Sequence, residues 1–450
     1  RLKGFDVLWQ VGTDHAGIAT QIVVERNLEK EGKTKESLGR KKFEKEIWKW
    51  KKESGTTITK QLRRLGASLD WKSEKFTMDD DFNEAVIEVF CTLYDEGLIY
   101  RGFRLANWDV KLQTALSDLE VVSNEEQGKI WEISYKTDLG NIVVATTRPE
   151  TMLGDVAIAV NPNDKRYKKF INKKAFIPLI NKEIPIIGDS YVDMEFGTGC
   201  LKITPGHDFN DFEIGQKNNL PIINIMKKNG TLNSNVPKKF RSLSMLEARK
   251  KILKDLKESG DLISEKDHMI TIPRSDRTGV TLEPFLTEQW YLKSDEMASK
   301  AKKLIQNKQI KLIPRNWENT FFSWMNEIRD WCISRQLWWG HRIPAWYDSD
   351  KNIYVGRNIS EVRKKYRLSN KIKLNQDEDV LDTWFSSQLW TFATLGWPKN
   401  TKRLKKFHPT SVLVTGFDII FFWVARMIMI TQKFLNEVPF KEVYVHGLVR

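Results

Sequence analysis

The stretch SVLVTGFDIIFFWVARMIMIT, residues 411–431, decides the fold class, because it is long and apolar enough to resemble a membrane span. It carries Asp418 and Arg426, and each charge would cost about 2.5–3.5 kcal/mol near the centre of a bilayer. A buried strand, a turn and a helix explain the segment better than a span does. The stretch therefore favours an α/β fold and predicts no membrane association.

The composition excludes several classes of protein. With 40% hydrophobic and 29% charged residues, the 450-residue chain can form a core, which a disordered chain cannot. The cysteines Cys91, Cys200 and Cys332 are too few for a disulfide framework and form no C-x-x-C pair, so a reducing, cytoplasmic compartment fits. The net charge of +14 indicates a polyanionic partner, with nucleic acid first, although a merely basic proteome would give the same value.

Strands followed by loops recur at both ends of the chain. Residues 5–11 predict a buried strand, followed by the loop Gly12–Gly17 and a helix over 18–31. Charged surface helices are expected over 38–65, and an amphipathic helix over 82–96. The segments DVLDTWF (379–385) and EVYVHGLV (442–449) are again typical of a strand that ends in a loop.

The middle of the chain has a different texture. Residues 130–272 contain short β-branched runs separated by Gly, Pro and Asn, with one helix over 245–259 and a polar linker at 124–128 before them. The sequence thus predicts an α/β, nucleotide-binding type of domain with a large β-rich insertion. The expected segments are 1–125, 126–275 and 276–450.

Two polar loops lie in places where ligands bind. In Gly12–Gly17, Asp14 could hold an ammonium group and His15 could contact a phosphate or ribose, unless Asp14 only caps the helix. In the β-rich segment, residues 146–151 and 197–211 combine hydroxyls, a cation and carboxylates. Strand alternation places Lys202 and Thr204 on one face, and Asp208 and Asp211 could share a helical face.

Such a pocket suits an amino acid ester that carries a hydroxyl group, the alternative being a solvated loop. His207 could act as a general base, but no partnered nucleophile accompanies it. A metal site would need more ligands than this segment offers.

Two further segments combine aromatic and polar residues. Residues 331–344 place basic side chains between tryptophans, which suits stacking and phosphate contact or simply a packed core. In the other segment, Trp384 could wall a small apolar pocket together with Ile419 and Trp423, which are four apart on an expected helix. Asp418, after a strand and a glycine, could accept a ribose hydroxyl pair or cap a core helix.

Taken together, these motifs resemble the valyl-tRNA synthetases, a family of class I aminoacyl-tRNA synthetases. The motifs are GTDHAGIATQ (12–21), NWD (107–109), TALSDLEV (114–121), TTRPETMLGD (146–155), FGTG-x-x-KITPGHDFND (196–211), ISRQLWWGHRIPAW (333–346), DTWFSSQLW (382–390) and TGFDIIFFWVARM (415–427). The resemblance covers essentially the whole chain. The first and last motifs favour the valyl over the isoleucyl or leucyl type.

The resemblance implies a Rossmann-type catalytic domain interrupted by an inserted β-barrel editing domain. It implies a monomeric ligase that uses ATP, with Mg²⁺, to activate valine, charges tRNA(Val) and hydrolyses mischarged threonyl-tRNA(Val). The implied valine site is Asp14, Trp384, Ile419 and Trp423, and the implied ATP site is His15, Gly416, Asp418, His446 and Gly447. The implied editing pocket is Arg148, Thr151, Lys202, Thr204, Asp208 and Asp211, with Asp211, Thr147 and Lys202 as its catalytic residues.

The chain also departs from the family. The HIGH-type signature and the KMSKS loop do not occur in it, so we expect a fragment that does not aminoacylate. Some relatives bind zinc through paired cysteines, but residues 273–279 contain none, so no zinc is predicted. A stand-alone deacylase and a non-catalytic RNA-binding fragment remain the alternatives.

We expect these 450 residues alone not to catalyse valine-dependent exchange of pyrophosphate with ATP. The two missing motifs stabilise the phosphates and the transition state, and a reaction that depends on charge stabilisation is slow without them. The measurement is incorporation of labelled pyrophosphate into ATP, and robust exchange would show that the motifs are dispensable.

Overall fold

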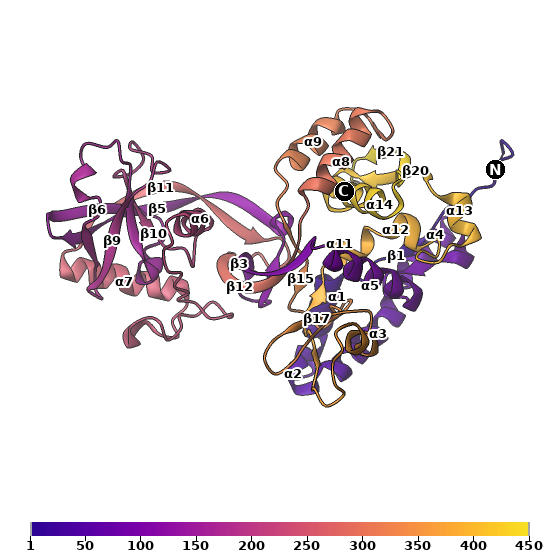
Figure 1. The fold of residues 1–450 in the computed structure, drawn as a ribbon, viewed down its shortest axis with the longest axis horizontal. Helices are drawn as coiled ribbons and strands as arrows, with labels where there is room; N and C mark the ends of the chain where they lie inside the picture. The colour runs from indigo at the N-terminus through magenta and orange to yellow at the C-terminus, as the bar shows by residue number, and fades with distance from the viewer. Residues whose placement is uncertain (1, 449–450) are drawn as a thin grey trace. The chain divides into compact units, whose positions relative to one another are not determined.

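The computed structural model describes residues 2–448 and divides the chain into two compact units (Figure 1). One unit combines the segments before residue 103 and after residue 289, and the other is Phe103–Gln289. Strands β3 (Ile99–Asp109) and β12 (Glu283–Leu292) carry the chain from one unit into the other. The second unit is thus continuous in sequence and lies between the two segments of the first, with wider bounds than the expected 126–275.

Parallel strands form the centre of the first unit. The order β13 (Lys311–Ile313), β21 (Phe440–His446), β20 (Thr410–Gly416) makes a three-stranded parallel sheet, and β1 (Gly12–Thr13) pairs in parallel with β2 (Lys75–Phe76). Gly416 pairs with His446, so the carboxyl ends of β20 and β21 lie side by side. In open α/β sheets this is the edge at which ligands bind.

Helices surround these strands. They are α1 (Gly17–Lys30), α2 (Lys35–Leu38), α3 (Arg40–Ser54), α4 (Thr57–Arg64), η1 (Trp71–Ser73), α5 (Asp80–Asp95), α8 (Asp295–Gln306), α9 (Trp317–Asn326), α10 (Ile359–Lys365), α11 (Thr383–Ser387), α12 (Trp390–Ala393) and α13 (Lys402–Phe407). The short strands are β14 (Trp331–Cys332), β15 (Ser334–Arg335), β16 (Ala345–Tyr347), β17 (Ile353–Val355), β18 (Asn375–Gln376) and β19 (Val380–Leu381). The main core is formed by apolar faces of α5, α8, α9 and the C-terminal helix, packed on β13 and β21.

The stretch 411–431 folds as the sequence predicts, with one difference. After β20 come the short helix η6 (Phe417–Ile419), the six-residue π-helix η7 (Ile420–Ala425) and α14 (Arg426–Leu435). The guanidinium of Arg426 lies 3.3 Å from the ring centroid of Trp331, which gives the buried charge a partner. Among residues 2–448, no helix is both long and apolar enough to cross a membrane.

A mixed seven-stranded sheet builds the second unit. Its order is β10 (Cys200–Ile203), β7 (Ala157–Val160), β9 (Lys182–Gly188), β8 (Lys174–Ile177), β5 (Val121–Thr137), β11 (Leu262–Ser275), and β6 (Gly140–Thr146) also pairs with β5. The other elements are β4 (Thr114–Leu116), η2 (Asp118–Glu120), η3 (Pro149–Gly154), η4 (Lys168–Phe170), α6 (Phe209–Lys217), η5 (Lys238–Phe240) and α7 (Met245–Ser259). The first strand of the order, β10, lies close to β6.

Two expectations about local structure are wrong. Residues 5–11 form no strand, and Phe5, Val7 and Trp9 are exposed, because only Gly12–Thr13 finds a pairing partner. Residues 124–128 are not a linker but the middle of β5, where backbone pairing with β11 outweighs their polar composition. The helices over 18–31, 82–96 and 245–259 are confirmed to within two residues.

Gly12 is expected to tolerate no side chain. A Cβ atom there would lie 2.1 Å from the Lys75 carbonyl oxygen and 2.2 Å from Cη2 of Trp390. Gly12→Ala should therefore lower the free energy of unfolding by about 1–3 kcal/mol, as overpacking does. Urea unfolding measures the change, with Gly447→Ala as the control, because among the described residues no heavy atom outside its chain neighbours lies within 4 Å of a Cβ at Gly447. Equal stability of the two variants would contradict the prediction.

Candidate functional sites

Three motifs that are far apart in the sequence meet in the first unit. The Gly17 amide donates a hydrogen bond to Thr383 Oγ1 at 2.9 Å, which joins the loop 12–17 to α11. The indole Nε1 of Trp339 donates to the His15 carbonyl at 2.8 Å, which joins the same loop to the tryptophan-rich segment. The structure therefore places the loop with Asp14 next to the helix with Trp384.

Asp14 and His15 lie in different environments within this loop. Asp14 is exposed, and its Oδ1 accepts from the Ala16 amide at 2.9 Å. Ala16 is the N-cap of α1 and, among the described residues, no side chain caps the helix, so the alternative that Asp14 only caps it is wrong. His15 is buried, and its Nδ1 lies 2.9 Å from Thr77 Oγ1. Burial, and then the neighbouring His341, lower the pKa of His15 well below its usual value, so its ring is neutral near pH 7.

The predicted apolar wall is partly assembled. Trp384 and Trp423 are half-buried, the Trp384 ring centroid is 5.2 Å from that of Phe422, and Trp423 Nε1 donates to the Ser387 carbonyl at 2.9 Å. Both tryptophans are thus held by contacts between α11 and η7. Ile419 ends the short helix η6 while Trp423 belongs to the π-helix η7, so the two residues do not lie on one continuous α-helix as expected.

The ends of strands β20 and β21 carry the residues that the sequence predicted to lie near ATP. Gly416 and His446 are paired neighbours, and Gly447 follows directly. A Cβ on Gly416 would lie only 2.4 Å from Asp418 Oδ1, so the glycine leaves room for that carboxylate. Asp418, His446 and Gly447 are exposed, and these four residues therefore form an open polar edge.

The basic residues of segment 331–344 mainly support the fold. Arg335 is 2% exposed, forms an ion pair with Asp382 and donates to the Cys332 carbonyl at 2.9 Å. Asp382 also accepts from Trp331 Nε1 at 3.1 Å and caps α11. Arg342 donates to two backbone carbonyls. The packed-core interpretation of this segment therefore applies to Arg335.

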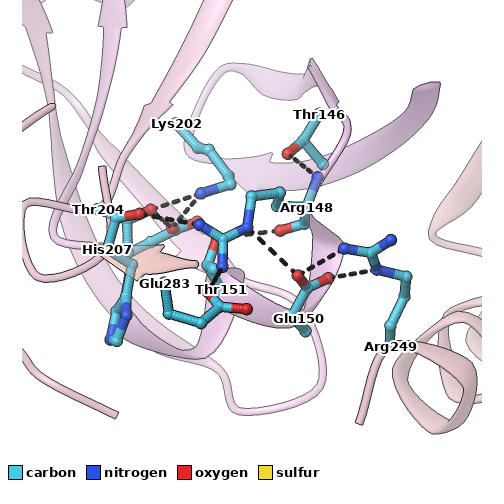
Figure 2. A network of polar contacts seen from close by, with 10 residues as sticks. Thr146, Arg148, Glu150, Thr151, Lys202, Thr204, His207, Arg249 and Glu283 are labelled. Atoms are coloured by element: carbon cyan, nitrogen blue, oxygen red, sulfur yellow. Dashed lines mark hydrogen bonds and ion pairs between the residues drawn. The ribbon is translucent and has the colours of Figure 1, made fainter. Parts of the chain in front are cut away.

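A buried carboxylate organises the candidate site of the second unit. Asp155 accepts from Thr204 Oγ1 at 2.7 Å and from the Tyr135 hydroxyl at 2.7 Å, and Lys202 Nζ lies 3.4 Å from it. Lys202 also bonds Thr204, so the two side chains share one face, as predicted (Figure 2). The sequence analysis assigned no role to Asp155. The available signal was its place as the last residue of the polar motif 146–155.

The two aspartates near α6 differ in burial. Asp208 is exposed, and its Oδ1 caps α6 by accepting from the amides of Asn210 and Asp211. Asp211 is buried, and its Oδ2 accepts from the Thr204 amide at 2.8 Å. Burial raises the pKa of Asp211 to about 7, although the charge of Lys202 opposes the shift. Asp211 is thus the carboxylate whose charge can change near neutral pH.

Arg148 makes several contacts in this site. Its Nη1 donates to the His207 carbonyl at 3.1 Å and its Nη2 pairs with Glu283 (Figure 2). The hydroxyl of Thr151 donates to the Arg148 carbonyl at 2.9 Å. Thr147 is half-buried, and within residues 2–448 its hydroxyl has no hydrogen-bond partner.

The suggestion that His207 is a general base is wrong. Its Nε2 accepts from the Ile225 amide at 3.0 Å, so the remaining proton lies on Nδ1. Burial, with the charges of Arg148 and Lys202, lowers the pKa of His207 to about 3. The neutral His207 ring therefore holds the backbone at Ile225 by accepting its amide hydrogen bond.

Asp211 gives a measurable pH dependence of stability. Its pKa rises from 3.8 to about 7 on folding, so the fold favours the protonated carboxyl, and stability falls as the pH rises through this window. Asp211→Asn keeps an acceptor for the Thr204 amide but cannot ionise. We expect it to be more stable than the wild type at about pH 8, with the difference shrinking toward about pH 4. Thermal unfolding at both pH values tests this, and equal stability at the higher pH would contradict it.

Both the family profile and the similar proteins match this chain over its whole length. The profile of the family described as "tRNA synthetases class I (I, L, M and V)" matches residues 1–450. Proteins named "Valine--tRNA ligase" from Francisella tularensis, Legionella pneumophila (strain Lens) and Coxiella burnetii are 54%, 55% and 56% identical over 452 aligned residues. These alignments cover 100% of this chain and 49% of each relative, so the chain spans about half the length of the curated relatives it matches.

A solved structure also matches the chain. It is the "Crystal structure of the ternary complex of Agrobacterium radiobacter K84 agnB2 LeuRS-tRNA-LeuAMS", with a TM-score of 0.46 and 17% identity over 99% of this chain and 60% of that one. The assignment rests on the profile match, which extends from the first residue to the last. The chain therefore belongs to the class I tRNA synthetase family of the I, L, M and V types.

Proposed function

We propose that the chain is part of a valine–tRNA ligase and contains a synthetic site and a hydrolytic editing site. The observation that carries the proposal is the 54–56% identity to proteins of that name along all of its length. The synthetic site is assigned to residues 1–125 and 276–450, and the editing site to residues 126–275. The proposed reaction joins valine to AMP and then to the terminal adenosine of tRNA(Val).

In the synthetic site, the exposed carboxylate of Asp14 is the proposed anchor for the valine ammonium group. Trp384, Ile419 and Trp423 are the proposed apolar wall for its side chain. The hydrogen bond between Trp423 and the Ser387 carbonyl supports this role, because it fixes the ring against α11.

The proposed ATP contacts follow from the edge of the parallel sheet. Gly416, Asp418, His446 and Gly447 lie at the carboxyl ends of β20 and β21, where α/β folds bind nucleotides. His15 is proposed to act here as a neutral, buried support for the neighbouring loop and not as a cation, because its pKa is lowered by burial.

Magnesium would enter such a site with the phosphates of ATP, since Mg²⁺ usually keeps substrate oxygens and water as ligands. The part of the chain that the structure describes contains no group of three or more His, Cys, Asp or Glu placed to hold a metal ion. We propose a monomeric, cytoplasmic protein whose partners are ATP, valine and tRNA(Val).

A second site is needed because threonine and valine are almost isosteric. An apolar pocket rejects an added hydroxyl only weakly, and the valine enzymes are the standard example of this. A polar pocket can select threonine, because valine would leave its buried hydrogen-bonding groups unpaired. The polar network around Thr204 and Lys202 supports such a pocket.

The proposed editing reaction is hydrolysis of the ester of threonyl-tRNA(Val) by water. Asp211 in its ionised form is the proposed anchor for the threonine ammonium, and its pKa of about 7 implies that editing weakens below neutral pH. Thr147 and Lys202 are proposed to act beside the ester, with the Lys202 charge favouring the developing oxyanion. Arg148, Thr151, Thr204 and Asp208 complete the pocket. The closeness of β10 and β6 supports a barrel around it.

The test is deacylation of threonyl-tRNA(Val) and valyl-tRNA(Val) by the 450-residue chain. We expect faster hydrolysis of the threonyl ester, with a rate that rises between about pH 6 and pH 8 as Asp211 ionises. Asp211→Ala should reduce the rate by at least about 100-fold, because the ammonium group loses its charged partner.

Asp276→Ala is the control, because this carboxylate lies in the same unit and pairs with Arg277, which is not one of the proposed pocket residues. Binding of tRNA without hydrolysis of either ester would indicate an RNA-binding fragment instead. Unchanged hydrolysis by Asp211→Ala would remove Asp211 from its role.

A further inference from the structure

Arg249, on helix α7, is bound to the candidate editing site through a buried carboxylate. Its Nε and Nη2 donate to Oε2 and Oε1 of Glu150 at 2.7 and 2.8 Å, which is a two-pronged contact (Figure 2). The Cζ of Arg249 lies 5.8 Å from the ring centroid of Trp131. A planar guanidinium with these neighbours has little freedom to move.

Glu150 needs this partner because it is buried. Its side chain is 1% exposed. Burial raises the pKa of Glu150, but the hydrogen bonds from Arg249 and the charges of Arg148 and Arg249 outweigh that effect and lower it overall. A buried carboxylate that lost its main partner would be strongly destabilised.

Arg148 is the other cation within reach of Glu150, but its contact is weak. The Arg148 Nε lies 3.4 Å from Oε1, outside the usual range for such bonds. Its two terminal nitrogens are directed instead to Glu283 and to the His207 carbonyl. Because each carboxylate oxygen of Glu150 accepts a bond from Arg249, Arg148 is free to bond Glu283 and the His207 carbonyl with its two terminal nitrogens.

We infer that Arg249 is a positioning residue for Arg148, an inference that rests on the proposed editing function. Without Arg249, the nearest way to pair the buried Glu150 is for Arg148 to rotate its fork onto it. That rotation breaks the ion pair with Glu283 and the bond to the His207 carbonyl, one residue before Asp208. The segment from Thr204 to Asp211 then loses a tether, and the ester is bound less well.

The kinetic experiment uses the whole 450-residue chain and threonyl-tRNA(Val). Arg249→Gln should raise KM for deacylation about tenfold, the effect of one lost charged hydrogen bond, and change kcat less than about twofold. Arg249→Lys, which keeps the charge but not the fork, should fall between wild type and Arg249→Gln. The control is Arg241→Gln, because Arg241 donates to the carbonyls of Val236 and Ser234 within the same unit.

A double variant separates positioning from general stability. If Arg249 acts through Arg148, then the Arg148→Gln/Arg249→Gln variant should have the same KM as Arg148→Gln alone. Multiplied effects in the double variant would overturn the inference. So would a fall in kcat and thermal stability without a change in KM, because that is what loss of packing between α7 and η3 alone would produce.

A structural measurement decides the inference even if the chain hydrolyses neither ester. In a crystal structure of Arg249→Gln, Arg148 should form a two-pronged contact with Glu150 and leave the His207 carbonyl. An Arg148 that keeps its position in the variant overturns the inference. Absent hydrolysis by the wild-type chain would overturn the proposed function separately.

Discussion

The need to pair buried charge is the constraint on which both units depend. A carboxylate removed from water is stable only when donors or cations surround it, and removing one partner is costly. Asp382 meets this need with Arg335 and Trp331, and it thereby fixes the start of α11. Asp155 meets it with Thr204 and Tyr135. In each unit the buried carboxylate therefore holds the elements that carry the candidate site.

The same constraint explains how protonation states are divided in the second unit. Asp211 accepts from one backbone amide, and the charge of Lys202 only partly offsets its burial, so its pKa rises to about 7. Glu150 is held by two arginines, and its pKa is lowered although it is at least as buried. Asp211, which ionises near neutral pH, and Glu150, which stays charged there, thus lie within one site. Such pairs of groups with divergent pKa values are typical of reactive sites.

Much of the local structure follows from the sequence. The strand-to-loop segments, the helix Met245–Ser259 and the placement of Lys202 and Thr204 on one face were predictable, because hydrophobic period and capping residues are local signals. Residues 124–128 were not, since their polar composition hides a strand that exists only because β11 pairs with it. The π-helix around Trp423 also has no local signal in the sequence.

The sequence by itself determined the family, because that depends on motifs, their order and their spacing. From the same motifs it predicted an insertion and the candidate residues. Only the tertiary structure decided which residues are partners. It identified Asp155, Glu150 and Arg249, withdrew His207 as a base and showed His15 to be buried. The physical reason is that burial and pairing join residues that are far apart in the chain: Glu150 and Arg249 are 99 positions apart, and Gly17 and Thr383 are 366 apart. No local sequence pattern records such a pairing.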